Sequence, residues 1–63
     1  MTVDEIVKLA GGVSKLAALL GVDHSSVSWW KRQGHIPPER AIAIHEILDV
    51  PLREIPRRRQ KAA

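Results

Sequence analysis

The chain has 63 residues, enough for one small domain and too few for a second hydrophobic core. It contains no cysteine, which excludes a disulfide framework and thiolate-bound zinc or iron–sulfur sites. Its histidines, His24, His35 and His45, are widely spaced and lack the pairing of metal ligands, so we expect no metal and no cofactor. No apolar run approaches the roughly 20 residues that cross a bilayer, and the first residues lack the pattern of a secretion signal. We therefore expect a cytoplasmic protein with no membrane partner.

The positive charge is concentrated at the C-terminal end. Residues 1–56 contain six basic and seven acidic side chains, a net charge of −1, whereas Arg57, Arg58, Arg59 and Lys61 add four positive charges. We therefore divide the chain into a domain at residues 1–56 and a basic flexible tail at residues 57–63. The tail has two interpretations: a solvated terminus, or an arm that binds phosphates and releases their counterions. Net charge alone therefore does not indicate DNA binding by the domain.

Helical periodicity divides the domain into four to five short helices, and no segment has the alternating pattern of a strand. The first helix begins at Thr2, which has the capping-box spacing to Glu5, and it ends at Gly11. The second covers residues 13–20 and ends at Gly21, a residue that readily adopts the left-handed conformation. The sequence predicts an all-α fold.

The third predicted helix covers residues 24–33, between Asp23 and Gly34. Asp23 is a good N-cap, and its carboxylate is expected to accept a hydrogen bond from the backbone N–H of Ser25 or Ser26. A fourth helix covers residues 38–48, and one further turn follows after Pro51. The apolar faces expected to be buried are Leu16, Leu19 and Leu20 in the second helix, Val27 and Trp30 in the third, and Ala41, Ile44, Ile47 and Leu48 in the fourth.

Residues 13–30 satisfy the geometric requirements of a helix-turn-helix, in which two steeply crossed helices are joined by three or four residues. Ala17 is small enough for the second helix of the motif to pack against it. Gly21 tolerates the positive φ of the turn, and Val22 can place one apolar side chain in the core. Val27 and Trp30, three positions apart, form the inner face of the second helix.

On these residues the chain resembles the Cro- and C1-type phage repressors, especially the short Cro-like and YdaS-like proteins of prophages. The resemblance covers roughly residues 10–55 and includes the later IPPER segment. It departs at Val13 and at His24 with Ser25, where family members often have glutamine. The matching residues are Gly12, Leu16, Ala17, Leu20, Gly21, Val22, Val27, Ser28, Trp30, Ile36, Pro37, Glu39, Arg40, Ala41 and Ile44. The resemblance implies a lambda-repressor-like DNA-binding domain.

If the third helix enters the major groove, its outer face contacts base edges through His24, Ser25, Ser28 and Trp29. The serine hydroxyls can donate or accept, so each discriminates weakly between bases. His24 either bonds guanine or is a solvated first-turn histidine. Trp29 has three interpretations: packing on sugars and thymine methyl groups, burial between subunits, or partial cover by the loop after the helix.

Six polar or basic residues are predicted to contact phosphates, which would fix register and affinity but not sequence preference. Arg40 is ambiguous, because it can instead pair with Glu39 or Glu46 on the surface. The predicted phosphate contacts are Ser14, Lys15, Lys31, Arg32, Gln33 and Arg40.

One half-site gives little affinity, and the related repressors are two-fold dimers, so we expect a weak homodimer on a pseudo-palindromic operator. Leu52, Ile55 and the end of the fourth helix are the candidate dimer surface. No nucleophile–base set or phosphate loop is found, so an enzyme is not expected. The expected function is a sequence-specific transcriptional regulator that binds double-stranded DNA. The alternatives are an antitoxin-like module that binds a toxin partner and also DNA, and general nucleic-acid binding through the tail alone.

Overall fold

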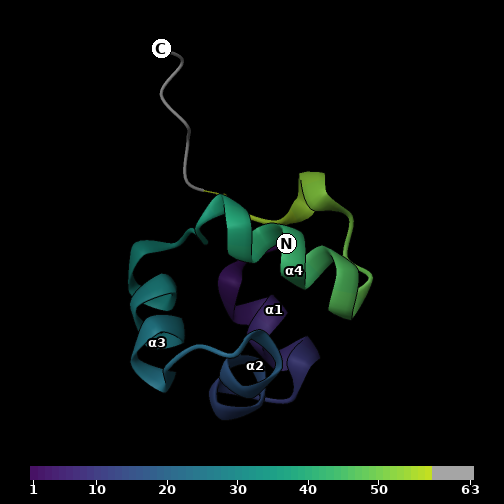
Figure 1. Cartoon of the computed structure of the whole chain (residues 1–63). Helices are drawn as coiled ribbons and strands as arrows, with labels where there is room; N and C mark the ends of the chain where they lie inside the picture. Colours follow the sequence, from purple (N-terminus) through teal and green to yellow (C-terminus); the bar gives the residue numbers. More distant parts are fainter. Residues whose placement is uncertain (58–63) are drawn as a thin grey trace.

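The computed structural model describes residues 1–57 and shows four α-helices followed by one 3₁₀ turn (Figure 1). The predicted all-α fold is confirmed, and residues 1–57 contain no strand. Residues 58–63, most of the predicted tail, lie outside the described residues. The elements are α1 (Val3–Ala10), α2 (Val13–Leu20), α3 (His24–Gln33), α4 (Pro38–Leu48) and the 3₁₀ turn Leu52–Glu54.

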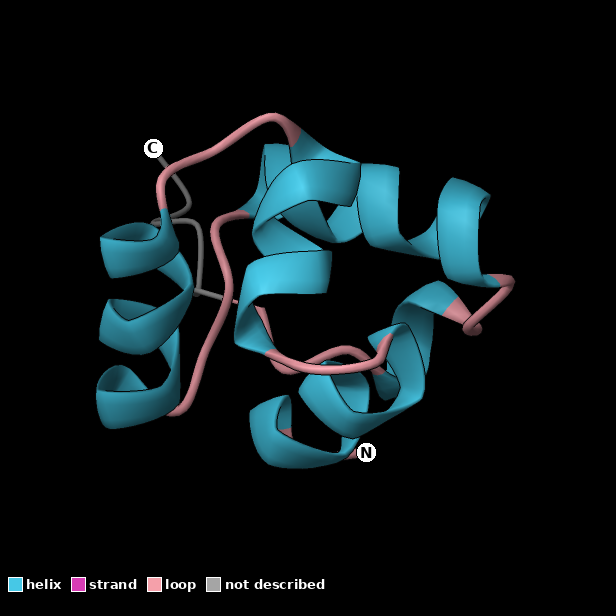
Figure 2. Ribbon diagram, turned by 90° about the horizontal axis from the view of Figure 1, so that it is seen from below, coloured by secondary structure: helices cyan, strands magenta, loops and turns pink. Residues whose placement is uncertain are grey.

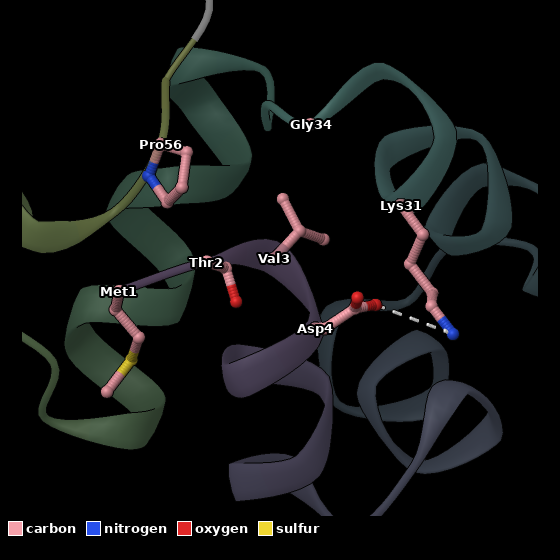
Figure 3. A pocket seen from close by; sticks show the side chains of 7 residues that line it. All are labelled: Met1, Thr2, Val3, Asp4, Lys31, Gly34 and Pro56. Carbon is pink, nitrogen blue, oxygen red and sulfur yellow. Dashed lines mark ion pairs between the residues drawn. The ribbon is translucent and has the colours of Figure 1, made fainter.

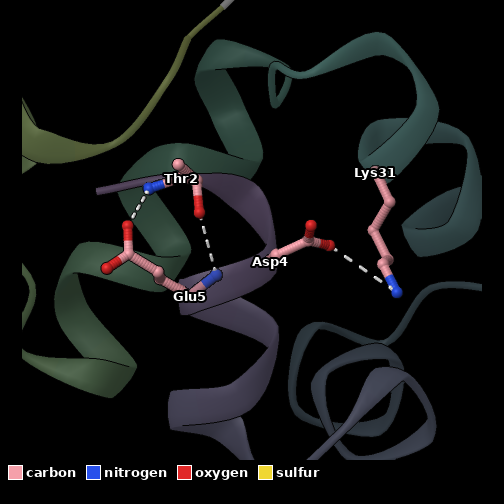
Figure 4. A network of polar contacts seen from close by, with 4 residues as sticks. All are labelled: Thr2, Asp4, Glu5 and Lys31. Carbon is pink, nitrogen blue, oxygen red and sulfur yellow. Dashed lines mark hydrogen bonds and ion pairs between the residues drawn. The ribbon is translucent and has the colours of Figure 1, made fainter.

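The predicted capping box opens α1. The Thr2 backbone N–H donates to Glu5 Oε1 (2.8 Å), and the Glu5 backbone N–H donates to Thr2 Oγ1 (3.2 Å) (Figure 4). These bonds satisfy two N–H groups that have no partner within the helix. The Thr2 N–H, and then the Thr2 hydroxyl, hold the pKa of Glu5 below its ordinary value because they stabilise the carboxylate.

The α2–α3 corner has the chemistry that the sequence predicts. Gly21 ends α2 with φ +67°, and the Val22 backbone N–H donates to the Ala17 carbonyl (3.0 Å). Ala17 of α2 and Val27 of α3 are both buried, and the small side chain of Ala17 leaves room for the two helices to pack closely. Val22 is half-buried and packs against the core. The α2–α3 corner therefore fixes the direction of α3 relative to α2.

One hydrophobic core joins all four helices and the C-terminal turn. Two predicted core faces are partly wrong, because Leu19 is 44% and Ile47 is 47% exposed. Both lie outside the arc of their helix that faces the core, which contains Leu16, Ala17 and Leu20 on α2 and Ala41, Ile44 and Leu48 on α4. The buried residues are Val3, Ile6, Val7, Leu16, Ala17, Leu20, Val27, Trp30, Ile36, Ala41, Ile44, Val50 and Ile55.

The chain after α4 folds back on the domain. Asp49 ends α4 in the left-handed conformation (φ +57°), and His45 Nδ1 donates to the Val50 carbonyl oxygen (2.7 Å). Ile55, predicted at a dimer surface, is instead buried in the core. The Ile36 backbone N–H donates to the Pro56 carbonyl (2.7 Å), next to an isolated bridge between Ile36 and Arg57. The end of the domain is therefore held beside the loop between α3 and α4.

Candidate nucleic-acid interface

Helix α3 lies at the edge of the molecule, with the other helices on one side of it only (Figures 1 and 2). Val27 and Trp30 anchor its inner face, with 0% and 5% of their surfaces exposed. Successive residues of an α-helix are rotated by about 100°, which places Ser25 and Arg32 nearly opposite this anchored face. The sequence therefore produces a helix whose outer side is free within residues 1–57.

The four residues predicted to contact bases gather on that outer side. Together with Arg32 they line an open hollow of about 370 Å³. Ser28 is half-buried, whereas His24 and Ser25 are exposed and Trp29 is 56% exposed. The hollow thus combines two hydroxyls, an imidazole, an indole and a guanidinium on one helix face, which is a set able to donate, accept and make apolar contacts.

The start of α3 differs in one detail from the sequence prediction. Asp23 occupies the N-cap position with extended backbone, but its carboxylate makes no hydrogen bond to the first turn. The predicted bond to Ser25 or Ser26 is therefore wrong. The Ser26 N–H donates instead to the Asp23 backbone carbonyl (3.0 Å), and the exposed carboxylate keeps its contact with water.

The residues predicted to contact phosphates are distributed over three elements. Ser14 and Lys15 are exposed at the start of α2, and Arg40 is half-buried in the first turn of α4. Arg40 forms no ion pair with Glu39 or Glu46. Arg32 lines the hollow and Gln33 is exposed at the end of α3, so these two extend the outer face towards its C-terminal end.

Lys31 differs from its neighbours because it faces α1. Its Nζ lies 3.7 Å from Asp4 Oδ1, the one ion pair found within residues 1–57 (Figure 4). Both side chains also line a second hollow, of about 250 Å³, in which they point toward one another (Figure 3). Sequence reasoning missed Asp4, since a contact between distant segments leaves no periodic pattern. The remaining residues of this hollow are Met1, Thr2, Val3, Gly34 and Pro56.

Residues 1–57 offer no group of three or more histidine or acidic side chains that could hold a metal ion. None of the helices described here is long and apolar enough to span a bilayer.

Comparison with known proteins identifies the family to which this arrangement belongs. A family model described as "DNA-binding transcriptional regulator Cro" matches residues 2–62. A search of curated protein sequences found no match. The chain is also similar to the solved structure of the Cro protein from the prophage element Xfaso 1 in Xylella fastidiosa strain Ann-1, with 40% sequence identity and a TM-score of 0.77. That similarity covers 84% of this chain and 85% of the Xylella protein. Nearly the whole chain matches the family model, so this protein belongs to the Cro family of DNA-binding transcriptional regulators.

Proposed function

We propose that this protein is a Cro-like repressor that inserts α3 into the major groove of a specific double-stranded DNA site. One observation carries the proposal: Val27 and Trp30 anchor one side of α3, while the opposite side presents an open hollow with both polar and cationic groups. A helix held rigidly by its inner face and free on its outer face fits the width of the major groove. Such a protein acts where the chromosome is, in the bacterial cytoplasm.

The proposed roles follow the position of each residue on the helix. His24, Ser25, Ser28 and Trp29 face base edges, because they lie on the free side toward the start of α3. The flanking residues Lys31, Arg32 and Gln33, with Ser14, Lys15 and Arg40 on the other helices, contact phosphates. The basic residues from Arg57 onward add further phosphate contacts and make binding more dependent on salt.

We propose that the functional form is a homodimer on a pseudo-palindromic operator. Two α3 helices about 34 Å apart would enter successive major grooves on one side of the duplex. Since Ile55 is buried, the candidate dimer surface moves to the exposed Ile47 and the half-buried Leu52, near the end of α4. We expect this dimer to be weak and to form fully only on DNA.

Selection from random duplexes tests this function directly. The expected result is a pair of inverted half-sites whose centres are separated by about one helical turn. A selection that enriches no sequence over scrambled competitor contradicts the proposal.

The orientation of α3 is tested by Arg32→Ala with Arg53→Ala as the matched control. Both variants remove one exposed arginine, but Arg53 lies on the 3₁₀ turn and outside the α3 hollow. If Arg32 binds one phosphate per subunit, the slope of log K against log salt falls by about 0.9 for each phosphate that is no longer neutralised, and Arg53→Ala leaves it unchanged. Equal slopes for wild type and Arg32→Ala remove Arg32 from the interface.

A further inference from the structure

Trp29 is the largest apolar group on the free side of α3. It is 56% exposed, whereas the adjacent Trp30 is 5% exposed. Residues 1–57 leave more than half of this side chain in water, so much of its apolar area stays unburied at an energetic cost. The residues beside it in the hollow, Ser25 and Ser28, bear short hydroxyls that leave room for a ligand group next to the ring.

The composition of the hollow restricts what it can bind. Arg32 is its one cationic side chain, and no carboxylate is among the five lining residues. The two hydroxyls can both donate and accept, so they tolerate several partners and select weakly. A ligand that matches all five residues therefore carries an anionic group for Arg32, polar edges for the hydroxyls, and at least one small apolar group for the indole.

We propose that this hollow binds the C5-methyl group of a thymine in duplex DNA, with the Trp29 indole making the apolar contact. Among the groups on base edges in the major groove, the thymine methyl is the apolar one. The phosphates beside it match Arg32, and the polar base edges match Ser25 and Ser28. This inference rests on the proposed function. It adds the thymine C5-methyl group as the part of the operator that Trp29 recognises.

A second copy of this chain is a poorer occupant of the same hollow. A two-fold contact through this face would place the hollow of one subunit against the hollow of the other. Such an interface would contain two copies of Arg32 and no carboxylate among the lining residues to compensate their charge. Like charges brought together in this way oppose association, whereas the phosphates of DNA satisfy both.

The test uses the duplex obtained from random selection and changes only methyl groups. Each thymine is replaced in turn by deoxyuridine, which lacks the C5-methyl group but keeps every hydrogen-bonding group. For wild-type protein, we expect deoxyuridine at one position per half-site to weaken binding about three- to fivefold for each methyl removed. Replacing a cytosine at that position by 5-methylcytosine is expected to restore part of the loss that cytosine causes.

Three variants assign the effect to Trp29. Trp29→Ala is expected to bind the thymine and deoxyuridine duplexes equally, and Trp29→Phe to retain part of the difference. Leu9→Ala is the matched control, since Leu9 is 53% exposed but lies on α1 and outside the hollow. It is expected to keep the full methyl dependence. Thermal melts of all three variants verify that the domain is folded.

The outcomes separate this inference from the function on which it rests. A strong preference for the selected site, with no loss at any deoxyuridine position, overturns the thymine contact and leaves the regulator intact. Failure to select any site contradicts the regulator itself. Methyl dependence that persists in Trp29→Ala also overturns the inference, as does conversion of a dimer to monomers by Trp29→Ala, which would place the indole in a subunit interface.

Discussion

Replacing Asp4 by asparagine tests whether α1 competes with DNA for a cation of α3. Lys31 Nζ and Asp4 Oδ1 are 3.7 Å apart, and their side chains are 40% and 71% exposed. An ion pair this open to water contributes at most about 1 kcal/mol to folding, so Asp4→Asn should alter the free energy of unfolding by less than that amount. If Lys31 binds a phosphate, however, the same pair must be broken before DNA is bound. The variant should therefore bind operator DNA about two- to fivefold more tightly per subunit.

Fluorescence anisotropy with a labelled operator, at several salt concentrations, measures the change in affinity. Glu46→Gln is the matched control, because it removes one exposed carboxylate from α4, away from Lys31. The decisive measurement is a double-mutant cycle, in which the gain from Asp4→Asn should disappear in a Lys31→Ala background. A gain that persists without Lys31 would mean that Asp4 simply repels DNA, and the competition argument would be refuted.

Two further predictions concern the fold that presents this surface. Trp30→Ala removes a core side chain that is 5% exposed and should destabilise the domain by about 3–5 kcal/mol, enough to unfold a chain of this size. Circular dichroism melts measure the loss, and an equal loss in Trp29→Ala would contradict the assignment of Trp30 alone to the core. Because the folded-state pKa of Glu5 is lowered, its contribution to stability is complete above the ordinary pKa of glutamate and is lost as the pH falls through the lowered value. Acidification from about pH 6 to pH 3 should therefore reduce the melting temperature of wild type more than that of Glu5→Gln, and parallel curves would rule this contribution out.

The helix ends were predictable where they depend on local chemistry. Thr2 and Glu5 are three positions apart and bond each other's backbone whatever surrounds them. Gly21 adopts the positive φ that the turn requires, a conformation that disfavours side chains with a Cβ. The exposure of Leu19 and Ile47 was not predictable in the same way. Short helices offer several apolar residues to one core, and only the positions of the neighbouring helices decide which of them are buried.

The candidate site was predictable to the extent that it lies on one helix. His24, Ser25, Ser28 and Trp29 share the hollow because helical rotation places them together once the inner face is known. The same rotation separates Lys31 from Arg32, although both are cations at the end of α3. What Lys31 meets on its own side, the carboxylate of Asp4, depends on how α1 packs against α3. Periodicity contains no information about that contact.

The paired tryptophans show how the core of this small domain determines its outer surface. Trp29 and Trp30 have identical side chains at consecutive positions, and their exposed fractions are 56% and 5%. The difference arises from the rotation of α3 about its axis, which Val27 and Trp30 set by filling the core between the helices. The direction in which Ser25, Ser28 and Trp29 point is therefore fixed by side chains on the other side of the same helix. Under the proposed function, stability and base preference depend on one set of packed residues, because a rotation of α3 that relieved the core would also turn the hollow away from the groove.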